Sequence, residues 1–549
     1  MSTPANPVPT QLRPGAAGVL RKTRGRAAWV LTLAAGASLL AACGGAPQPQ
    51  QPALAVLIVV DQLRADLLDR YDALFTGGLR RLRDEGRIFV NGTHDHANTL
   101  TAPGHATIST GVTPARHGIV GNAWYERVDG EWTRVENVHD PNVELVGAPG
   151  IAAASPHRLL RPGLADWVRA ADSASIVVSV SGKDRGAILP GAHARGYVYW
   201  FQPAAGRFVT STHYRTEDPE WVTRFNEDVL PTFMRDSVWE STIPESALHL
   251  TQPDTAAHEG DGVHTYFPHR FEDVRDDADP QSFWRWFETT PMLDAATLAL
   301  AETAVQALGL GRDGSPDLLT ISLSQTDRIG HAYGPLSREQ LDNLLRLDRA
   351  LGEFFAFLDE TVGAGRWVLA LSADHGVHEA PEVAERLGLP GLRATARERD
   401  ALNRAVAEAQ ERAKGSDDAT VAAYIAEAVK QLPFVVNAWT HAELDAETAP
   451  ADSFVELFRK ARHPGREPGV LSRQGVEVMF VEGYISYPRG ATHGSPYYKD
   501  RHVPIIFMGA GVEPGIDSTR AATVDIAPTL ARLIGVPAPD DLDGKALTW

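Results

Sequence analysis

Disulfide bonds cannot stabilise this chain, because its 549 residues include a single cysteine, Cys43. A small scaffold held together by several cystines is therefore excluded. Positive charge is also scarce: 52 Lys and Arg residues face 70 Asp and Glu residues, which leaves a net charge of −18. This excess argues against nucleic acid, or an anionic membrane surface, as a general partner. An anionic ligand would need a local cationic site, which metal ions could supply.

The N-terminal region lacks an apolar run long enough to predict a membrane span. The apolar stretch from Ala27 to Leu40 follows a basic cluster that includes Arg21 and Arg24, and it ends at Leu-Ala-Ala-Cys43. This order is typical of a bacterial lipoprotein signal. We predict a signal peptide over residues 1–42, lipid attachment at Cys43 and a tether over residues 43–53. The protein would then be exported, as a periplasmic or cell-surface lipoprotein that meets the membrane through its lipid anchor only.

Short apolar runs rich in Val, Ile and Leu recur through the rest of the chain. They span Leu54 to Val60, Ser175 to Val180, Leu318 to Leu323, Trp367 to Leu371 and Val503 to Met508. Continuous runs of this kind predict parallel strands that are buried on both faces. Amphipathic stretches between them predict helices over Gly78 to Glu85 and Gln340 to Leu358. The predicted fold of residues 54–549 is α/β, a doubly wound and mostly parallel sheet with helices on both faces.

Two segments interrupt this alternation. Residues near 195–290 are rich in aromatic side chains and are predicted to form loops. Residues near 380–470 contain a charged stretch, Ala394 to Lys414, that predicts a helix. Both segments are interpreted as insertions that pack on the main sheet. A sharper hypothesis is that the first insertion forms a wall or cap of an active site.

Acidic and histidine side chains follow several of the predicted strands. They are Asp61, Asp327, His331, Asp374 and His375, and a further histidine, His493, lies shortly before the last predicted strand. One aspartate after a strand is usually a helix cap or a turn residue. Because ligands bind at the carboxyl ends of strands in open α/β sheets, the set as a whole predicts a metal centre. Mixed carboxylate and imidazole ligands suit Zn²⁺, and two such ions suit phosphoryl transfer.

A threonine stands at the start of another predicted helix. In Thr99-Leu100-Thr101-Ala102-Pro103-Gly104-His105, the proline favours a first helical turn that continues through Ser109. Thr101 would lie at the N-terminus, where backbone N–H groups favour developing negative charge. It is either an ordinary helix cap or a nucleophile, and a nucleophilic hydroxyl needs activation such as metal coordination.

Seven strings together resemble the PafA-type alkaline phosphatases, in the order of that family and over roughly residues 54 to 535. They are VVDQLRAD, TAPGHATISTG, HGIVGNAW, SGKDRGAILPG, QTDRIGHAYGP, SADHG and THGSPYYKDRHVPIIF. The resemblance implies two Zn²⁺ ions per chain. It implies that Asp327, His331 and His493 hold one ion, and that Asp61, Asp374 and His375 hold the other together with the Thr101 alkoxide. It also implies substrate contacts from Asn122, Lys183 and Arg185.

The expected activity is hydrolysis of small-molecule phosphate monoesters through a phospho-threonine intermediate. Two Zn²⁺ ions would balance three aspartates and one alkoxide, so Lys183 and Arg185 would match the two charges of a monoester. A phosphodiesterase or nucleotide pyrophosphatase of the same superfamily would share the metal ligands but generally lack this Lys-x-Arg pair. A non-catalytic surface lipoprotein that binds metal is a further alternative. His94, His96, His105 and His117 are expected to be structural.

Overall fold

The computed structural model describes residues 51–549 apart from 234, 236, 261 and 447–452. The predicted signal peptide and Cys43 lie outside the described residues, as does most of the predicted tether. A nine-stranded sheet occupies the centre of the body. Its strands, from edge to edge, are β17 (Gly515–Ala522), β2 (Arg87–Thr93), β16 (Ile505–Gly509), β11 (Trp367–Ser372), β1 (Leu54–Val60), β10 (Asp317–Leu323), β5 (Val177–Ser181), β6 (Tyr197–Gln202) and β7 (Arg207–Val209).

Most neighbours in this sheet are parallel, which confirms the predicted fold class. β1 pairs in parallel with β10 and β11, so Val59 lies opposite both Ser322 and Ser372. One prediction was wrong: β16 is antiparallel to β11 and to β2. A buried apolar run reports that both faces of a strand are covered, but it carries no information on strand direction.

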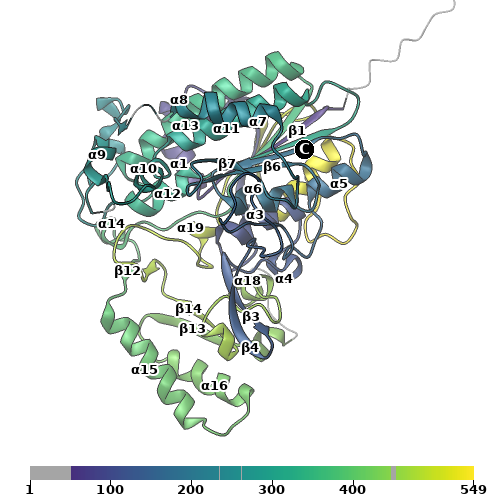
Figure 1. Ribbon diagram of the computed structural model, residues 1–549. Coiled ribbons are helices and arrows are strands. Elements are labelled where there is room, and N and C mark those ends of the chain that lie inside the picture. The colour runs from purple at the N-terminus through teal and green to yellow at the C-terminus, as the bar shows by residue number, and fades with distance from the viewer. Residues whose placement is uncertain (1–50, 234, 236, 261, 447–452) are drawn as a thin grey trace, which may run out of the picture. The chain divides into compact units, whose positions relative to one another are not determined.

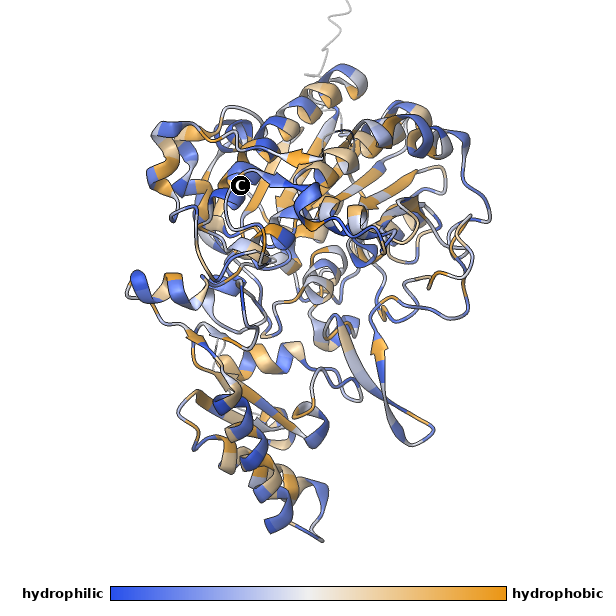
Figure 2. Cartoon of the chain, turned by 60° about the vertical axis from the view of Figure 1, so that its left-hand side comes forward, coloured by the Kyte–Doolittle hydropathy of each residue, from blue (hydrophilic) through white to orange (hydrophobic). Residues whose placement is uncertain are grey.

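Alternate residues of β1 enter two different cores. Val56 and Ile58 pack in the core on one face, whereas Ala55 and Leu57 pack in the core on the other. The helices of the first face include α1 (Ala65–Arg70), α2 (Gly78–Glu85), α11 (Met292–Leu308) and α13 (Arg338–Leu358). Those of the second include α3 (Thr101–Thr110), α5 (Leu164–Ala171), α6 (Asp184–Gly191) and α20 (Ile526–Leu533). Figure 1 shows these helices on either side of the sheet, and Figure 2 shows the hydrophobic residues concentrated in its strands.

The segment near 380–470 forms a small structure with its own core. α15 (Ala396–Arg412) and α16 (Asp418–Val429) pack through residues such as Ile425 beside an antiparallel pair of strands, β13 (Val435–Thr440) and β14 (Val476–Phe480) (Figure 1). Other two-stranded pairs are β3 (Ala123–Val128) with β4 (Glu131–Glu136), β12 (Leu392–Arg393) with β15 (Tyr484–Ile485), and β8 (Val238–Trp239) with β9 (His269–Arg270).

The remaining helices are short connections around this frame. They are α4 (Pro114–His117), α7 (Glu220–Arg224), α8 (Leu230–Phe233), α9 (Phe271–Val274), α10 (Ser282–Phe287), α12 (Gln325–Tyr333), α14 (Pro381–Arg386), α17 (His441–Asp445), α18 (Phe454–Ala461) and α19 (Tyr498–Arg501). Within the described part of the chain, no helix has the length and hydrophobicity needed to cross a bilayer.

Candidate metal centre and active site

Five of the six predicted ligands follow the carboxyl ends of neighbouring strands, and His493 lies in the loop that precedes the antiparallel strand β16. β1 ends just before Asp61, and β11 ends just before the segment that carries Asp374 and His375. β10 leads into α12, while the loop between β15 and α19 carries His493. The structure divides the six into two groups, and in each group one ligand atom from every residue lies within 4.8 Å of the others. These groups are Asp327 with His331 and His493, and Asp61 with Asp374 and His375.

The first group contains Asp327, His331 and His493. Asp327 and His331 are one turn apart on α12, and His331 Nε2 is 3.2 Å from Asp327 Oδ1. His493 Nε2 lies 3.5 Å from the same oxygen and 3.1 Å from His331 Nε2. The Nδ1 atoms pair instead with backbone oxygens, of Ala491 at 2.9 Å for His331 and of Thr99 at 2.7 Å for His493. Each Nδ1 must therefore carry the proton, and each Nε2 offers a lone pair to a cation.

The second group, Asp61 with Asp374 and His375, is fully buried. His375 Nε2 lies 3.5 Å from Asp61 Oδ1 and 3.5 Å from Asp374 Oδ2. None of these three buried atoms forms a hydrogen bond within the described residues, although His105 Nδ1 lies 3.1 Å from Asp374 Oδ2. Burial, reinforced by the carboxylates of Asp327 and Asp374, raises the pKa of Asp61 well above its usual range. Converging buried acceptors of this kind fit a bound cation such as Zn²⁺.

Lys183 connects the two groups. Its ammonium lies 2.5 Å from Asp61 Oδ2 and 2.6 Å from Asp327 Oδ2. Burial opposes ionisation of Asp327, but Lys183 and His331 outweigh it and hold the pKa of Asp327 well below its usual range. The predicted cationic residue therefore lies within hydrogen-bond distance of both candidate metal groups.

Gln62 also connects the groups, and sequence reasoning assigned it no role. Its backbone N–H donates to Asp374 Oδ1 at 3.0 Å, and its side-chain amide donates to Asp327 Oδ1 at 2.7 Å. Its φ of 70° is uncommon for a residue with a side chain, and such conformations cluster at functional sites. Asp294 of α11 was missed as well: its carboxylate accepts from Ser324 N at 2.7 Å, at the start of α12. The only sequence signal for Gln62 was its place directly after Asp61.

Thr101 is the first residue of α3 and is buried, as predicted. His105 holds this turn: its Nδ1 pairs with the Thr101 carbonyl oxygen at 2.9 Å and its Nε2 with Ser322 Oγ at 2.8 Å. The helix also lies very close to the second metal group. A Cβ atom added at Gly104 would lie 2.0 Å from the carbonyl oxygen of Asp374. Glycine at this position therefore sets how closely Thr101 approaches that group.

Replacement of Gly104 by alanine tests this contact. The added methyl group must push α3 away from Asp374, and a displacement near 1 Å at a reacting group costs about 100-fold in rate. We expect Gly104→Ala to lower kcat/KM for an aryl phosphate by about 100-fold in a protein that still binds metal. Gly469→Ala is the matched control, because nothing lies within 4 Å of a Cβ atom there. Equal activity of the two variants would show that the close approach is unimportant.

Asn122 and Arg185 border a cavity of about 370 Å³. The Asn122 side-chain oxygen accepts from Ala102 N at 2.9 Å, which leaves its amide nitrogen as a donor next to the first turn of α3. The Arg185 guanidinium lies beside the neighbouring carboxylate, with Arg185 Nη1 3.6 Å from Asp184 Oδ1. The structure thus brings Asn122 directly to the N-terminus of α3, and it places Arg185 on the wall of the same cavity.

Comparison with known proteins identifies the family. The model of the type I phosphodiesterase / nucleotide pyrophosphatase family matches residues 55–466. Alkaline phosphatase PhoV of Synechococcus elongatus is 33% identical over 527 residues, which cover 91% of this chain and 92% of PhoV. Alkaline phosphatase PafA of Elizabethkingia meningoseptica is 31% identical over 531 residues, which cover 91% and 94%. The chain belongs to this family, in its alkaline phosphatase branch.

Solved structures agree with this placement. The crystal structure of wild-type PafA matches the alkaline phosphatase described here with a TM-score of 0.82 at 29% identity, over 90% of this chain and 98% of PafA. A PafA variant in which one threonine, one asparagine, one lysine and one arginine are substituted matches with the same TM-score at 28% identity, over the same shares of the two chains.

The histidines expected to be structural are not members of the two candidate metal groups, although His105 Nδ1 lies 3.1 Å from Asp374 Oδ2. His94 pairs with the Ala373 oxygen and with Thr523, and burial lowers its pKa to about 4. His96 is buried against His94, with ring centroids 5.1 Å apart. His117 pairs with Thr107 at 3.1 Å.

The predicted loop character of residues near 195–290 is wrong at its start. Tyr197–Gln202 forms β6 inside the central sheet, and the aromatic rings of Tyr199, Phe201 and Phe208 belong to a core. The cavity that reaches His331 and His493 is instead lined from the segment 477–487. Sequence reasoning did not find this wall, because its residues show neither a motif nor a charge pattern. The first insertion contributes Trp200 and Gln202 to the cavity beside Arg185.

A third set of metal-capable side chains lies beside the antiparallel pair of β13 and β14. It comprises His441, Glu467 and Glu477. Ser472 Oγ lies 2.5 Å from Glu467 and 2.7 Å from Glu477, so hydrogen bonding already holds this set together. It is far less enclosed than the second metal group, because only Glu467 is buried.

Proposed function

We propose that this enzyme hydrolyses phosphate monoesters in two steps, with Thr101 as nucleophile beside two Zn²⁺ ions. The observation that carries the proposal is the convergence of six Asp and His ligands, in two groups, next to the buried N-terminus of α3. The names of the relatives support it, because PhoV and PafA are alkaline phosphatases. Bound at these groups, two divalent ions would act as Lewis acids on the attacking and leaving oxygens and would lower the pKa of water.

The proposed reaction has two displacement steps at phosphorus. Thr101 Oγ attacks phosphorus, so a Thr101 O–P bond forms while the bond to the leaving group breaks. Water then attacks the phospho-threonine, releases phosphate and restores the Thr101 hydroxyl. At the start of α3 the Ala102 N–H already donates to Asn122 Oδ1, and Pro103 has no N–H. The Thr101 backbone N–H and the Asn122 amide would therefore hold the non-bridging oxygens. The leaving group would depart on the side of His331 and His493.

The charge of the site favours a monoester. Lys183 and Arg185 would supply two positive charges, which match a phosphate monoester dianion better than a diester monoanion. Two contacts support this assignment: Lys183 pairs with Asp61 and Asp327, and Arg185 borders a cavity that Asn122 also lines. Four residues of this chain also match, in residue type and in order, the four residues substituted in the PafA variant. They are Thr101, Asn122, Lys183 and Arg185.

Export and lipid attachment at Cys43 form a separate part of the proposal. Support comes from the basic cluster, the apolar run and the Leu-Ala-Ala-Cys43 end of that run. Mass spectrometry of membrane-extracted protein should find a lipid on Cys43. A soluble mature chain that keeps residues 1–42 would contradict this part and leave the catalytic proposal intact.

A phosphodiesterase is the second candidate, because the matching family model is described by that activity. The deciding experiment compares an aryl phosphate monoester with its methyl diester on the zinc-loaded protein. We expect kcat/KM to be at least about 100-fold higher for the monoester, since the diester carries one charge fewer into the cationic site. A preference for the diester would overturn the proposed substrate class.

Arg185 offers a sharper test of the same point. Truncation in Arg185→Ala removes one positive charge and its hydrogen bonds to the substrate, a loss that corresponds to about 10- to 100-fold in rate. We expect kcat/KM to fall by that factor for the monoester and by less than about threefold for the methyl diester. Arg224, which is exposed on α7, provides the matched control Arg224→Ala. Equal losses for both esters would remove Arg185 from the monoester preference.

A further inference from the structure

A cavity of about 390 Å³ opens beside the first metal group, and its walls include His331, His493 and Asn122. This volume lies in the usual range for small-molecule sites. If phosphorus is attacked from Thr101 and the leaving oxygen departs toward His331 and His493, the rest of the leaving group enters this cavity. The inference drawn from it therefore rests on the proposed function.

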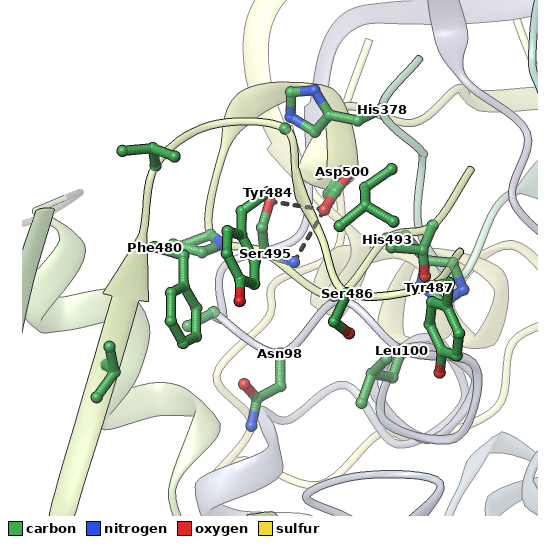
Figure 3. Close-up of a pocket in the computed structure, with 18 of the residues that line it drawn as sticks. Asn98, Leu100, His378, Phe480, Tyr484, Ser486, Tyr487, His493, Ser495 and Asp500 are labelled. Carbon is green, nitrogen blue, oxygen red and sulfur yellow. Dashed lines mark hydrogen bonds between the residues drawn. The ribbon is translucent and has the colours of Figure 1, made fainter. Parts of the chain in front are cut away.

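Aromatic and aliphatic side chains form much of the wall. Phe480 and Tyr484 stack with ring centroids 4.4 Å apart and an interplanar angle of 11°. Figure 3 draws these two rings on one side of the cavity, and Tyr487 and Leu100 on the side of His493. Tyr487 is 60% exposed, which is unusual for a large aromatic residue that lines a cavity. A flat leaving group could cover this ring and gain a stacking contact.

The charges of the cavity restrict what can enter. Among the described residues that line it there is no lysine or arginine, while Glu477 and Asp500 contribute carboxylates. Asp500 is buried and accepts hydrogen bonds from Ser495 N at 2.8 Å and from Ser495 Oγ at 2.6 Å. A leaving group with its own phosphates would bring negative charge to this wall without a cation to pair with it. Asn98 and Ser486 offer uncharged polar groups instead (Figure 3).

We propose that this cavity is a leaving-group site for planar, uncharged groups, and that the enzyme selects nucleoside or aryl monophosphates over polyphosphates. Tyr487 is the residue through which the selection is tested, because it is exposed and its loss should not disturb folding. The selection acts on binding of the leaving group and adds no chemical step to the reaction.

The experiment measures kcat/KM for 5′-AMP, ethyl phosphate and ADP on the zinc-loaded protein. AMP and ethyl phosphate both release a primary alcohol, so their ratio reports contacts with the nucleoside rather than leaving-group reactivity. We expect AMP to exceed ethyl phosphate and ADP by at least about tenfold. In Tyr487→Ala the ratio of AMP to ethyl phosphate should fall about tenfold, the size expected when one base-stacking contact is lost. Tyr487→Phe should keep the ratio.

Tyr424→Ala is the matched control, because Tyr424 is an exposed tyrosine of α16 that does not line this cavity. An unchanged ratio in Tyr487→Ala, or ADP turned over as well as AMP, would overturn the leaving-group site while leaving monoester hydrolysis in place. If the wild-type protein hydrolyses no monoester, calorimetric measurement of adenosine binding tests whether the cavity binds a nucleoside. Binding weakened about tenfold by Tyr487→Ala would support the site without the proposed activity, and absence of binding would overturn it.

Discussion

Replacing Thr101 with alanine is expected to lower kcat for phosphate monoesters by at least about 1,000-fold, because removal of a nucleophile leaves only the stabilisation that the rest of the site provides. Thr101 begins α3 and is buried beside the second metal group, so no other hydroxyl of α3 occupies its position at the start of the helix. The variant should still bind two Zn²⁺ ions, because six Asp and His ligands remain.

Three measurements separate a nucleophile from a helix cap. Thr101→Ser keeps a hydroxyl group and should retain measurable turnover, whereas Thr101→Ala should not. Wild-type protein quenched in acid during turnover of a radiolabelled monoester should carry label on Thr101, and the alanine variant should carry none. Thermal unfolding should show nearly equal midpoints for the two variants. Full activity of Thr101→Ala would eliminate the phospho-threonine mechanism, and a large loss of stability without metal binding would assign Thr101 a structural role.

Much of the fold could be predicted from the sequence, because strands buried on both faces leave continuous apolar runs. β1 and α2 have the predicted bounds, and β11 and α13 begin or end within two residues of them. The direction of β16 could not be predicted, since burial on both faces looks the same in parallel and antiparallel strands. β6 was missed because its aromatic sequence lies in a stretch that otherwise resembles loops.

The candidate site divides in the same way. Five of its ligands could be found because carboxylates and a histidine pair follow strands whose carboxyl ends meet at one edge of the sheet. His493 precedes the antiparallel β16, and it was found through the string in which it stands. Residues that act through contacts with these ligands could not be predicted from the sequence. Gln62 looks like an ordinary turn residue, and its two hydrogen bonds to Asp327 and Asp374 depend on segments more than 250 positions away in the sequence. The cavity wall around Tyr487 could not be predicted for the same reason, because its residues come together beside His331 and His493 only in the folded chain.

Removal of metal is expected to have the second large effect. A chelator should lower kcat by at least about 1,000-fold. Without the ions, no group in the site would activate Thr101 or stabilise the leaving oxygen. It should also lower the unfolding midpoint by several degrees. The second group places acceptors without hydrogen bonds together in a fully buried position, on Asp61, Asp374 and His375. A metal ion that binds this group only in the folded state stabilises that state. Added Zn²⁺ should restore both properties.

Elemental analysis of purified variants assigns the ions to their groups. Wild-type protein should contain two Zn²⁺ per chain, and His331→Ala should lose the ion of the first group while the buried second group keeps its own. His441→Ala is the matched control, because His441 belongs to the third set of metal-capable side chains, which Ser472 already joins by hydrogen bonds. Its metal content and activity should equal those of the wild type. A single ion in the wild type, or loss of zinc from His441→Ala but not from His331→Ala, would show that the two groups do not form the metal centre.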